Sequence, residues 1–246
     1  MAQPRSNPER PSPELLYLDD WLAVVAKPSG EVVHPGWARG EPTTMTRLRD
    51  ALGQWVYPVH RLDRGTSGAV VLARDPDTAR SLGERWSAGE VTKRYVALVR
   101  GKPPDKVTVD HPVPRGERGS ERVAAKTHFR RLAVCSVARC SLVEAEPVTG
   151  RLHQIRRHLK HLSHPIVGDV TYGDGRINRA FRAEWDLHRL ALHAATIAFD
   201  HPVTDEAVTV VAPVPADLAT PLAALGLAEF AGCPLGGPDQ AGEARM

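Results

Sequence analysis

Hydrophobic residues alternate with polar ones along much of the chain, and β-branched residues are frequent in these runs. The two-residue period is typical of strands that bury one face. It predicts strands at 14–17, 21–26, 56–61, 69–73, 93–100, 106–109, 123–133, 137–146, 191–199 and 207–211. The chain is therefore predicted to be rich in strands, with polar turns between them, such as the K-P-S-G run at 27–30.

Hydrophobic residues at helical spacing predict fewer helices, at 44–52, 75–87, 151–162, 178–185 and 215–225. The second has the best defined start, because Asp75 can cap a helix and Pro76 fits the first helical position. These helices are scattered singly and do not alternate strictly with strands, which disfavours a doubly wound parallel sheet. The predicted fold class is α+β.

The two ends of the chain differ in composition from the part between them. Residues 1–13 are rich in proline and charge and are predicted to be a disordered leader, and 232–246 a flexible tail. Nothing marks a linker within 14–231, which we expect to fold as one domain. No apolar stretch near the start suits a secretory signal, and no run of about 18 apolar residues predicts a membrane span.

Composition narrows the classes of function further. The 246 residues carry a formal net charge of +3, and the 20 glycines and 21 prolines follow no fixed period, which excludes collagen. The slight positive charge suits nucleic acid only if basic residues cluster. Cys135, Cys140 and Cys233 form no C-x-x-C pair, so we expect neither disulfides nor a cysteine zinc site, and a cytoplasmic location.

The run H-R-L-D-R-G-T-S-G at 60–68 concentrates polar chemistry between two predicted strands. Asp63 lies between Arg61 and Arg64, and nearby positive charge favours the ionised form of a carboxylate, which is a usable nucleophile. The alternative is an ordinary turn in which Asp63 and Ser67 satisfy backbone donors. A serine-hydrolase interpretation fails, because Ala69 stands where a nucleophile elbow needs glycine.

A second polar concentration lies at 150–169. On a helix, one face of this segment is hydrophobic and the opposite face is basic. The hydrophobic face holds Leu152, Ile155, Leu159 and Leu162, and the basic face holds His153, Arg157, Lys160 and His164. Arg156 falls on the border, where a half-buried guanidinium can pair with a carboxylate. The basic face is either a phosphate-contacting surface or simply a solvated helix face.

The histidines of this segment do not predict a metal site. Their spacings miss the i, i+4 pair of a zinc-binding helix, and Arg156, Arg157 and Lys160 lie among them and repel a cation.

Tyr95 follows two basic residues in a predicted strand. Its ring is suited to stacking on a base and its hydroxyl to proton exchange, although most strand tyrosines serve only in packing.

Taken together, these motifs resemble those of the RluA-type pseudouridine synthases in order and spacing. The matching runs are H-R-L-D-R-x-T-S-G at 60–68, K-R-Y at 93–95, G-R-x-H-Q-I-R at 150–156 and H-P-I-V-G-D at 164–169. The resemblance extends from K-P-S-G at 27–30, with His34, to the L-H-A run at 192–194. The G-D-G-R-x-N-R run at 173–179 and the doubled arginine at 156–157 are most similar to a branch that modifies tRNA.

The resemblance implies a mixed, largely antiparallel sheet in two halves with a central catalytic cleft. Many members of the family carry an S4 RNA-binding domain, but none is expected here, because only about thirteen residues precede the first predicted strand. The resemblance implies that Asp63 is the catalytic aspartate, that Arg156 pairs with it, and that Tyr95 stacks on uracil. Leu192 would form an apolar wall, and Arg61 would fill the space left by the flipped base. Further RNA contacts are expected from His60, Arg64, His153, Arg157 and Lys160, and RNA specificity from the loops at 37–44 and 115–126.

The implied reaction is the isomerisation of uridine in RNA to pseudouridine. It is redox-neutral, so neither a cofactor nor a metal is expected. The expected substrate is tRNA, at a T-arm site of the uridine-65 type, and the alternative is a ribosomal RNA stem-loop. A noncatalytic RNA-binding role is a minor alternative, and neither a membrane nor a protein partner is predicted.

Overall fold

In the computed structural model, residues 12–34, 36, 41–116 and 121–230 are described. The predictions of a leader and of a tail at 232–246, which includes Cys233, lie almost entirely outside these ranges. So do parts of the two loops expected to give RNA specificity, at 37–40 and 117–120. Among the described residues, no helix has both the length and the hydrophobicity needed to cross a membrane.

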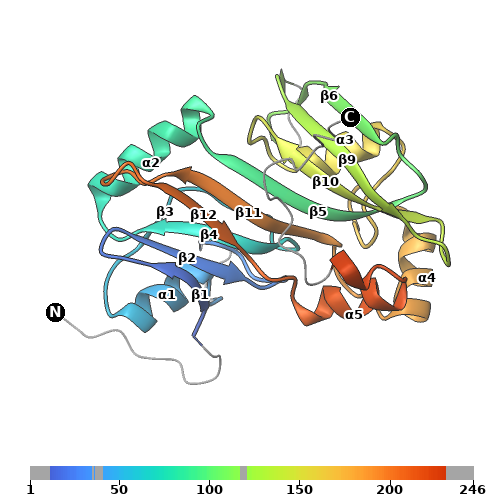
Figure 1. Ribbon diagram of the computed structural model, residues 1–246, viewed down its shortest axis with the longest axis horizontal. Helices are drawn as coiled ribbons and strands as arrows, with labels where there is room; N and C mark the ends of the chain where they lie inside the picture. The colour runs from blue at the N-terminus through green and yellow to red at the C-terminus, as the bar shows by residue number, and fades with distance from the viewer. Residues whose placement is uncertain (1–11, 35, 37–40, 117–120, 231–246) are drawn as a thin grey trace, which may run out of the picture.

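A mixed, largely antiparallel sheet of 10 strands forms the centre of the molecule (Figure 1). Its main order is β1-β2-β4-β11-β5-β10-β9-β6, with β3 added to β4 and β12 to β11. The strands are β1 (Glu14–Leu18), β2 (Leu22–Lys27), β3 (Tyr57–Pro58), β4 (Ser67–Ala73), β5 (Thr92–Arg100), β6 (Lys106–Asp110), β9 (Lys126–Val134), β10 (Cys140–Pro147), β11 (Leu192–Asp200) and β12 (Ala207–Val211). A separate hairpin pairs β7 (Val113–Pro114) with β8 (Arg122–Val123). The predicted fold class is confirmed.

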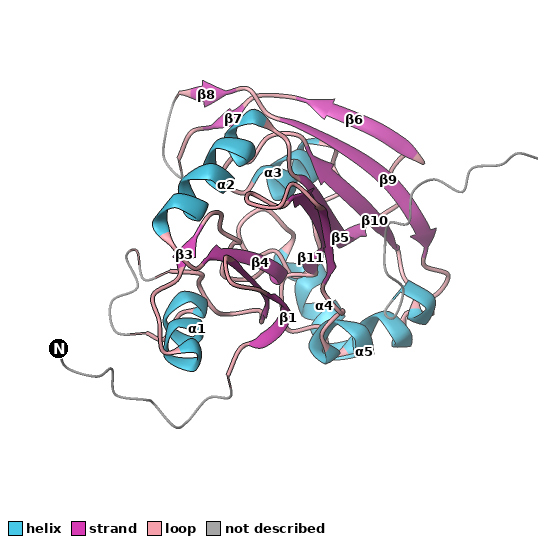
Figure 2. Ribbon diagram, turned by 60° about the vertical axis from the view of Figure 1, so that its left-hand side comes forward, coloured by secondary structure: helices cyan, strands magenta, loops and turns pink. Residues whose placement is uncertain are grey.

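Helices surround this sheet on several sides (Figure 2). They are α1 (Thr44–Leu52), α2 (Pro76–Ala88), α3 (Gln154–His161), α4 (Gly175–Trp185) and α5 (Ala216–Ala224), followed by a short 3₁₀ turn, η1 (Ala228–Phe230). Helices α1 and α2 lie at the end of the sheet formed by β1–β4, whereas α3, α4 and α5 lie around the half that contains β5, β9 and β10. The two halves join where β4 and β5 flank β11.

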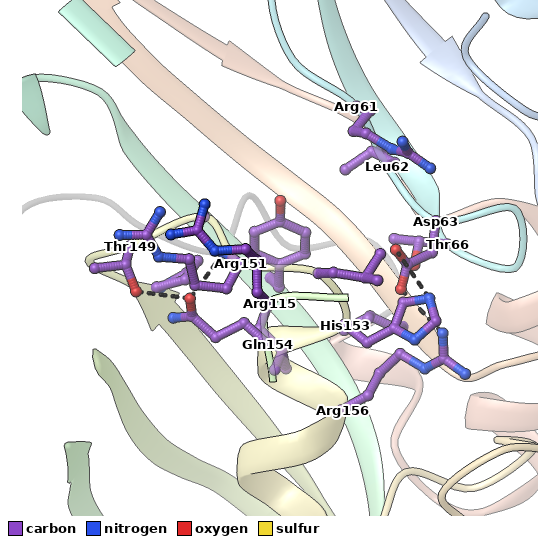
Figure 3. A pocket seen from close by; sticks show the side chains of 16 residues that line it. Arg61, Leu62, Asp63, Thr66, Arg115, Thr149, Arg151, His153, Gln154 and Arg156 are labelled. Atoms are coloured by element: carbon purple, nitrogen blue, oxygen red, sulfur yellow. Dashed lines mark hydrogen bonds and ion pairs between the residues drawn. The ribbon is translucent and has the colours of Figure 1, made fainter. Parts of the chain in front are cut away.

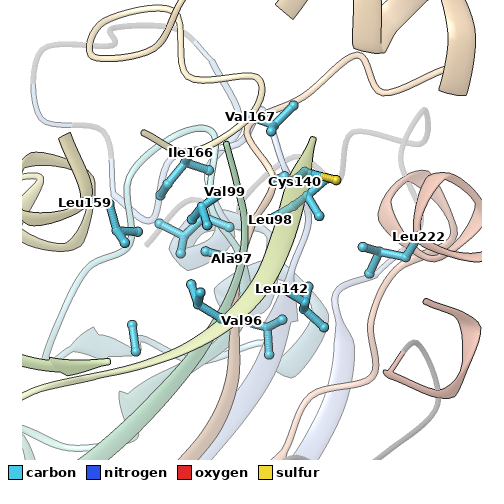
Figure 4. Close-up of a cluster of buried hydrophobic side chains, with 14 of the residues drawn as sticks. Val96, Ala97, Leu98, Val99, Cys140, Leu142, Leu159, Ile166, Val167 and Leu222 are labelled. Atoms are coloured by element: carbon cyan, nitrogen blue, oxygen red, sulfur yellow. The ribbon is translucent and has the colours of Figure 1, made fainter. Parts of the chain in front are cut away.

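Strand β4 is buried along its whole length, because hydrophobic side chains cover both faces. Val71 and Ala73 pack with Leu82 of α2, whereas Val70 and Leu72 pack with Leu48 of α1. A third cluster lies in the other half, where Val96, Leu98 and Val99 of β5 pack with Leu142, Leu159 and Ile166 (Figure 4). These cores hold the start of β4 and the middle of β5 in fixed positions.

β4 and β11 are parallel where His193 pairs with Ser67, and their backbones meet very closely. Gly68 has a φ of 120°, and a Cβ placed on it would lie 2.2 Å from the carbonyl oxygen of Ala194. Only glycine fits such an approach without a shift of the backbone. The end of the 60–68 run is thereby fixed against β11.

Local signals predicted the first two helices well. Helix α1 has the predicted bounds, begins with a reciprocal capping box between Thr43 and Thr46, and ends at left-handed Gly53. Helix α2 begins with Pro76, and the side chain of Asp75 accepts a hydrogen bond from the backbone N–H of Thr78 at 2.9 Å. Both starts follow from side chains that satisfy free backbone donors.

Several predicted strand or helix boundaries were wrong. The strand expected at 56–61 is only β3, because proline at position 58 offers no backbone donor and the chain then leaves the sheet. The strand expected at 123–133 is divided into β8 and β9, which belong to different sheets. The strand expected from 137 begins at Cys140, after a turn closed by Cys135 N–H donating to Cys140 O at 3.0 Å. Helix α4 begins before 178, because Asp174 caps it.

The helix expected from 151 begins at Gln154. His153 stands before it in a left-handed conformation, with φ 53° and ψ 27°. The Gln154 side chain accepts hydrogen bonds from the Thr149 hydroxyl at 2.6 Å and from the Arg151 backbone N–H at 3.0 Å. These bonds fold residues 149–153 into a turn, which directs the side chains at the start of α3 toward the sheet junction.

Candidate active site

A cavity of about 370 Å³ opens where the 60–68 loop, β5 and the start of α3 meet (Figure 3). This volume lies within the range usual for small-molecule pockets. Sequence positions far apart line it together: Arg61, Leu62, Asp63, Thr66, Tyr95, Arg115, Pro147, Thr149, Gly150, Arg151, Leu152, His153, Gln154, Ile155, Arg156 and Leu192. The structure thus brings together the three residues expected to be catalytic, Asp63, Tyr95 and Arg156.

The loop that carries Asp63 is anchored from behind by the K-P-S-G turn. Lys27 Nζ and the Gly30 backbone N–H both donate to Arg64 O, at 3.3 and 2.8 Å, and the Ser29 hydroxyl donates to Gly65 O at 2.9 Å. Within the loop, Thr66 N–H donates to Asp63 O at 3.0 Å. With its backbone held on both sides, Asp63 keeps a defined position at the cavity.

Arg156 is the charged partner of Asp63. Its Nη1 donates to Asp63 Oδ2 at 3.1 Å, while Nε and Nη2 donate to Asp169 Oδ2 and Oδ1 at 2.8 and 2.9 Å. The Arg156 side chain is 9% exposed, that of Asp63 20%, and that of Asp169 0%. A bidentate pair with a buried carboxylate therefore fixes the guanidinium that reaches Asp63.

The electrostatics favour the ionised forms of Asp169 and Arg156. Burial acts to raise the pKa of Asp169, but hydrogen bonds from Arg156 and from the Tyr172 and Thr171 backbone outweigh it and lower that pKa. Burial also acts against the charge of Arg156, yet its bonds to Asp169 and the charges of Asp169 and Asp63 raise its pKa. Two carboxylates share one guanidinium, and the more exposed carboxylate is the one that faces the cavity.

The arginines that flank Asp63 in the sequence are not its partners. Arg61 is exposed on the cavity wall, and Arg64 points away and forms an ion pair with Glu41 at 2.9 Å. The guanidinium that pairs with Asp63 is that of Arg156 instead. Adjacent side chains in an extended loop point in different directions, so the charge is supplied by α3, which is remote in the sequence.

Tyr95 lies on β5 between small neighbours, with Ala145 of β10 on one side and Ala194 of β11 on the other. Burial, together with the charge of Asp63, raises the pKa of Tyr95 above its usual value, so the phenol keeps its proton at neutral pH. Leu192 begins β11 and lines the same cavity. An apolar side chain and an aromatic ring thus stand beside the carboxylate.

Several expected RNA contacts lie outside the cavity lining. His60 stacks on Trp86 at 4.9 Å and accepts from Val71 N–H at 3.0 Å, and burial, with the charge of Lys93, lowers its pKa to about 3. His60 is therefore a neutral packing residue rather than a surface RNA contact. Lys160 is exposed on α3.

Arg157 also has a different set of partners from the one expected. It donates from Nη1 to Pro114 O at 2.7 Å, from Nη2 to Gly116 O at 3.0 Å and from Nε to Tyr172 Oη at 2.9 Å. These bonds join α3 to the β7–β8 hairpin, which brings Arg115 to the cavity. Arg157 is thus committed to structural contacts, while exposed Arg61, Arg115 and Arg151 form the basic rim of the cavity.

Sequence reasoning assigned no role to Asp169 or to Tyr172. Asp169 was visible only as the last residue of a matching motif, and its pairing with Arg156 depends on the turn at 169–172. Tyr172 places its ring 5.1 Å from the Arg156 guanidinium and 5.7 Å from that of Arg157. Among the described residues, no group of three or more histidine, cysteine or acidic side chains is arranged to hold a metal ion.

Comparison with known proteins agrees with this arrangement. The family model described as RNA pseudouridylate synthase matches residues 21–161. The chain belongs to this family of isomerases, which convert uridine in RNA to pseudouridine.

Its relatives include proteins named tRNA pseudouridine synthase C. That of Vibrio vulnificus is 38% identical over 221 residues, which cover 82% of this chain and 90% of the relative. That of Pectobacterium carotovorum is 37% identical over 219 residues, which cover 80% of this chain and 57% of that longer relative. Among solved structures, human RNA Pseudouridylate Synthase Domain Containing 4 is 27% identical with a TM-score of 0.71, covering 87% of this chain and 93% of its own.

Proposed function

We propose that this protein isomerises a specific uridine of tRNA, at a T-arm site of the uridine-65 type, with residues 14–231 as its catalytic domain and the cytoplasm as its location. The proposal of tRNA is carried by the similarity to relatives named tRNA pseudouridine synthase C, which extends over 82% of the chain in one of them. The assignment of the site rests on Asp63, which faces the cavity while Arg156 holds its second oxygen.

In this proposal Asp63 acts on the sugar of the target nucleotide. The N1–C1′ bond breaks, the uracil turns, and a C5–C1′ bond forms, while C5 loses a proton and N1 gains one. Asp63 either attacks C1′ or assists loss of the base to a glycal. Both routes need an ionised carboxylate shielded from water, which would otherwise hydrolyse the ribosyl intermediate. Arg156 donates a hydrogen bond to Asp63 and offsets its negative charge.

Tyr95 is proposed to stack on the turning uracil and to exchange the C5 proton. Its raised pKa means that it enters the reaction as a neutral phenol. It can therefore accept a proton on its oxygen only as its own proton leaves, so a second acceptor must take part. Asp63 lies on the same cavity wall and its charge acts on Tyr95, which makes it the nearest candidate acceptor.

RNA must present the target uridine outside its helical stack, at a cost of a few kcal/mol. We propose that Arg61 enters the vacated space, because it is exposed beside Asp63 and forms no ion pair with a carboxylate in the described part of the chain. Arg115 and Arg151 extend the same rim, where they are placed to contact phosphates. Leu192 would form the apolar side of the base pocket.

Mapping of pseudouridine in RNA from cells that lack this protein tests the proposal. Loss of a single T-arm pseudouridine, restored by the wild-type protein and not by Asp63→Asn, is the expected result. Loss confined to a ribosomal RNA stem-loop would overturn the tRNA assignment and keep the reaction. Restoration by Asp63→Asn would overturn the role of Asp63 and favour a noncatalytic RNA-binding role.

A further inference from the structure

His153 lies beside Asp63 on the cavity wall, next to the carboxylate oxygen that Arg156 does not hold. Its Nε2 is 3.8 Å from Asp63 Oδ1, whereas Arg156 binds Oδ2 (Figure 3). The His153 side chain is only 17% exposed. The free oxygen of Asp63 therefore faces an imidazole nitrogen at slightly more than hydrogen-bond distance.

The backbone at this position has a conformation that is uncommon for residues other than glycine. His153 has a φ of 53° and stands before α3 without any side-chain hydrogen bond that caps the helix. The left-handed region disfavours residues that carry a Cβ, and such conformations cluster at functional sites. Glycine would be relaxed here, so the observed histidine points to a role for the ring.

Tyr172 is the hydrogen-bond partner of His153 Nδ1. The Tyr172 hydroxyl lies 3.1 Å from His153 Nδ1, and its oxygen accepts a hydrogen bond from Arg157 Nε at 2.9 Å. A guanidinium can only donate, so it occupies a lone pair of the phenol oxygen and leaves the hydroxyl proton for His153. With Nδ1 as the acceptor, the neutral ring has its own proton on Nε2, which faces Asp63.

We propose that Tyr172 fixes His153 in the neutral Nε2–H tautomer, and that His153 is a positioning residue that orients the free oxygen of Asp63. The proposal rests on the catalytic role of Asp63 proposed above. A neutral donor orients a carboxylate without adding a second full charge to the one supplied by Arg156. A small rotation of Asp63 toward the sugar shortens the contact into a hydrogen bond, as often occurs when substrate binds.

The surrounding charges agree with a neutral ring. The groups that face His153 are Asp63 from the loop before β4, Arg156 and Arg157 from α3, and Asp169 and Tyr172 from the following turn. Burial lowers the pKa of His153, and both arginines lower it further, against the opposing effect of the two carboxylates. The hydrogen bond from Tyr172 adds to this effect, because it stabilises the neutral form.

Imidazole ¹⁵N NMR of the RNA-free protein tests the tautomer directly. We expect His153 to show protonated Nε2 and unprotonated Nδ1 at neutral pH, and Tyr172→Phe to give a mixture of tautomers. Phenylalanine keeps the ring beside Arg156 and Arg157, so the change removes only the hydroxyl. The matched control is Tyr17→Phe, whose hydroxyl instead donates to Asp19. A protonated Nδ1 in the wild-type protein overturns the proposal without any variant.

Single-turnover kinetics on RNA tests the positioning role. Tyr172→Phe is expected to slow the chemical step about tenfold, or about 1.4 kcal/mol, with an unchanged enzyme concentration at half saturation. It should also move the acid limb of the pH profile to higher pH. An unchanged rate and acid limb with a confirmed change of tautomer would remove His153 from the reaction. If the wild-type protein modifies no RNA, the proposed function fails, while the NMR result still decides the tautomer.

Discussion

Arg156 binds Asp169 through two nitrogens at 2.8 and 2.9 Å, and this pair determines how the same guanidinium meets Asp63. Asp169 is fully buried and also accepts backbone N–H bonds from Thr171 and Tyr172. Its position is thus fixed by the turn that follows α3. The partner of Asp63 is therefore held in place before any RNA binds, which is the preorganisation that electrostatic catalysis requires.

Asp169→Asn tests this arrangement. Asparagine keeps the shape but removes the charge that balances buried Arg156, and breaking a buried ion pair costs about 3–5 kcal/mol. We expect a loss of free energy of unfolding near that range, measured by urea denaturation at pH 7. Asp77→Asn is the control, because its ion pair with Arg80 is exposed and should change stability by less than about 0.5 kcal/mol. Equal effects of the two changes would contradict the structural role of Asp169.

Asp63→Asn is expected to abolish isomerisation while leaving RNA affinity within a few-fold of the wild type. The amide is nearly the same size, so the cavity and the basic rim persist, but it provides no anionic oxygen to act on the sugar. Tritium release from C5-labelled RNA measures turnover, and filter binding measures affinity. Retained turnover would reject Asp63 as the essential carboxylate.

Lys27 gives stability a specific dependence on pH. It is 1% exposed and donates to the carbonyl oxygens of Pro28, Glu31 and Arg64, and burial lowers its pKa from 10.5 to about 7. Between pH 7 and 10.5 the unfolded chain therefore binds more protons at this residue than the folded one. The contribution of Lys27 to the free energy of unfolding should rise with pH in this window, by at most about 1.4 kcal/mol per pH unit.

Comparison of the wild-type protein with Lys27→Met isolates this contribution, because the other titrating groups are shared. The difference in free energy of unfolding is expected to grow in favour of the wild type from pH 7 to 9 and to stay constant below pH 6. Urea denaturation at each pH measures it. A difference that does not change with pH would show that Lys27 titrates alike in the folded and unfolded chains.

The sequence predicted those parts of the fold that depend on neighbouring residues. The bounds of α1 and the start of α2 follow from capping side chains and are confirmed. The break between β8 and β9 was missed, because the sequence pattern of 123–133 does not reveal that the two strands join different sheets. Hydrophobic pattern gives the period of an element, whereas the edge of a sheet is a tertiary property.

In the candidate site, too, the sequence predicted local features but not the contacts that depend on tertiary structure. The border position predicted for Arg156 agrees with a side chain that is buried yet reaches the cavity. Its partner Asp169 could not be paired with it from spacing, because that contact depends on the turn at 169–172. His60 and Arg157 were expected to contact RNA. In the structure, however, Trp86 stacks on His60, and Arg157 donates to backbone carbonyls of the β7–β8 hairpin.

Gly68→Ala tests the close approach of β4 to β11. The added Cβ would meet the backbone of Ala194 at 2.2 Å, in a conformation that alanine rarely adopts. We expect a loss of stability of several kcal/mol or failure to fold, checked by thermal unfolding. Gly83→Ala in α2 is the matched control: a Cβ there meets nothing within 4 Å, and better helix propensity should stabilise the protein by about 0.5–1 kcal/mol.

The exposed arginines of the cavity rim provide a test of how RNA is bound. Arg61 and Arg151 lie on the lining with exposed side chains, so each is placed to neutralise a phosphate and release its counterion. Removal of one such contact lowers affinity and reduces the slope of log affinity against log salt by about 1. Arg151→Ala and Arg61→Ala should both weaken tRNA binding in this way. Arg80→Ala, on α2 outside the cavity lining, should leave the slope unchanged.

Arg61 is also proposed to enter the space left by the flipped uridine. Its replacement should therefore slow single-turnover isomerisation at saturating RNA, because the flipped state loses its support. Arg151→Ala should leave that rate intact. An equal salt slope for all three variants and the wild type would remove the rim from the RNA interface.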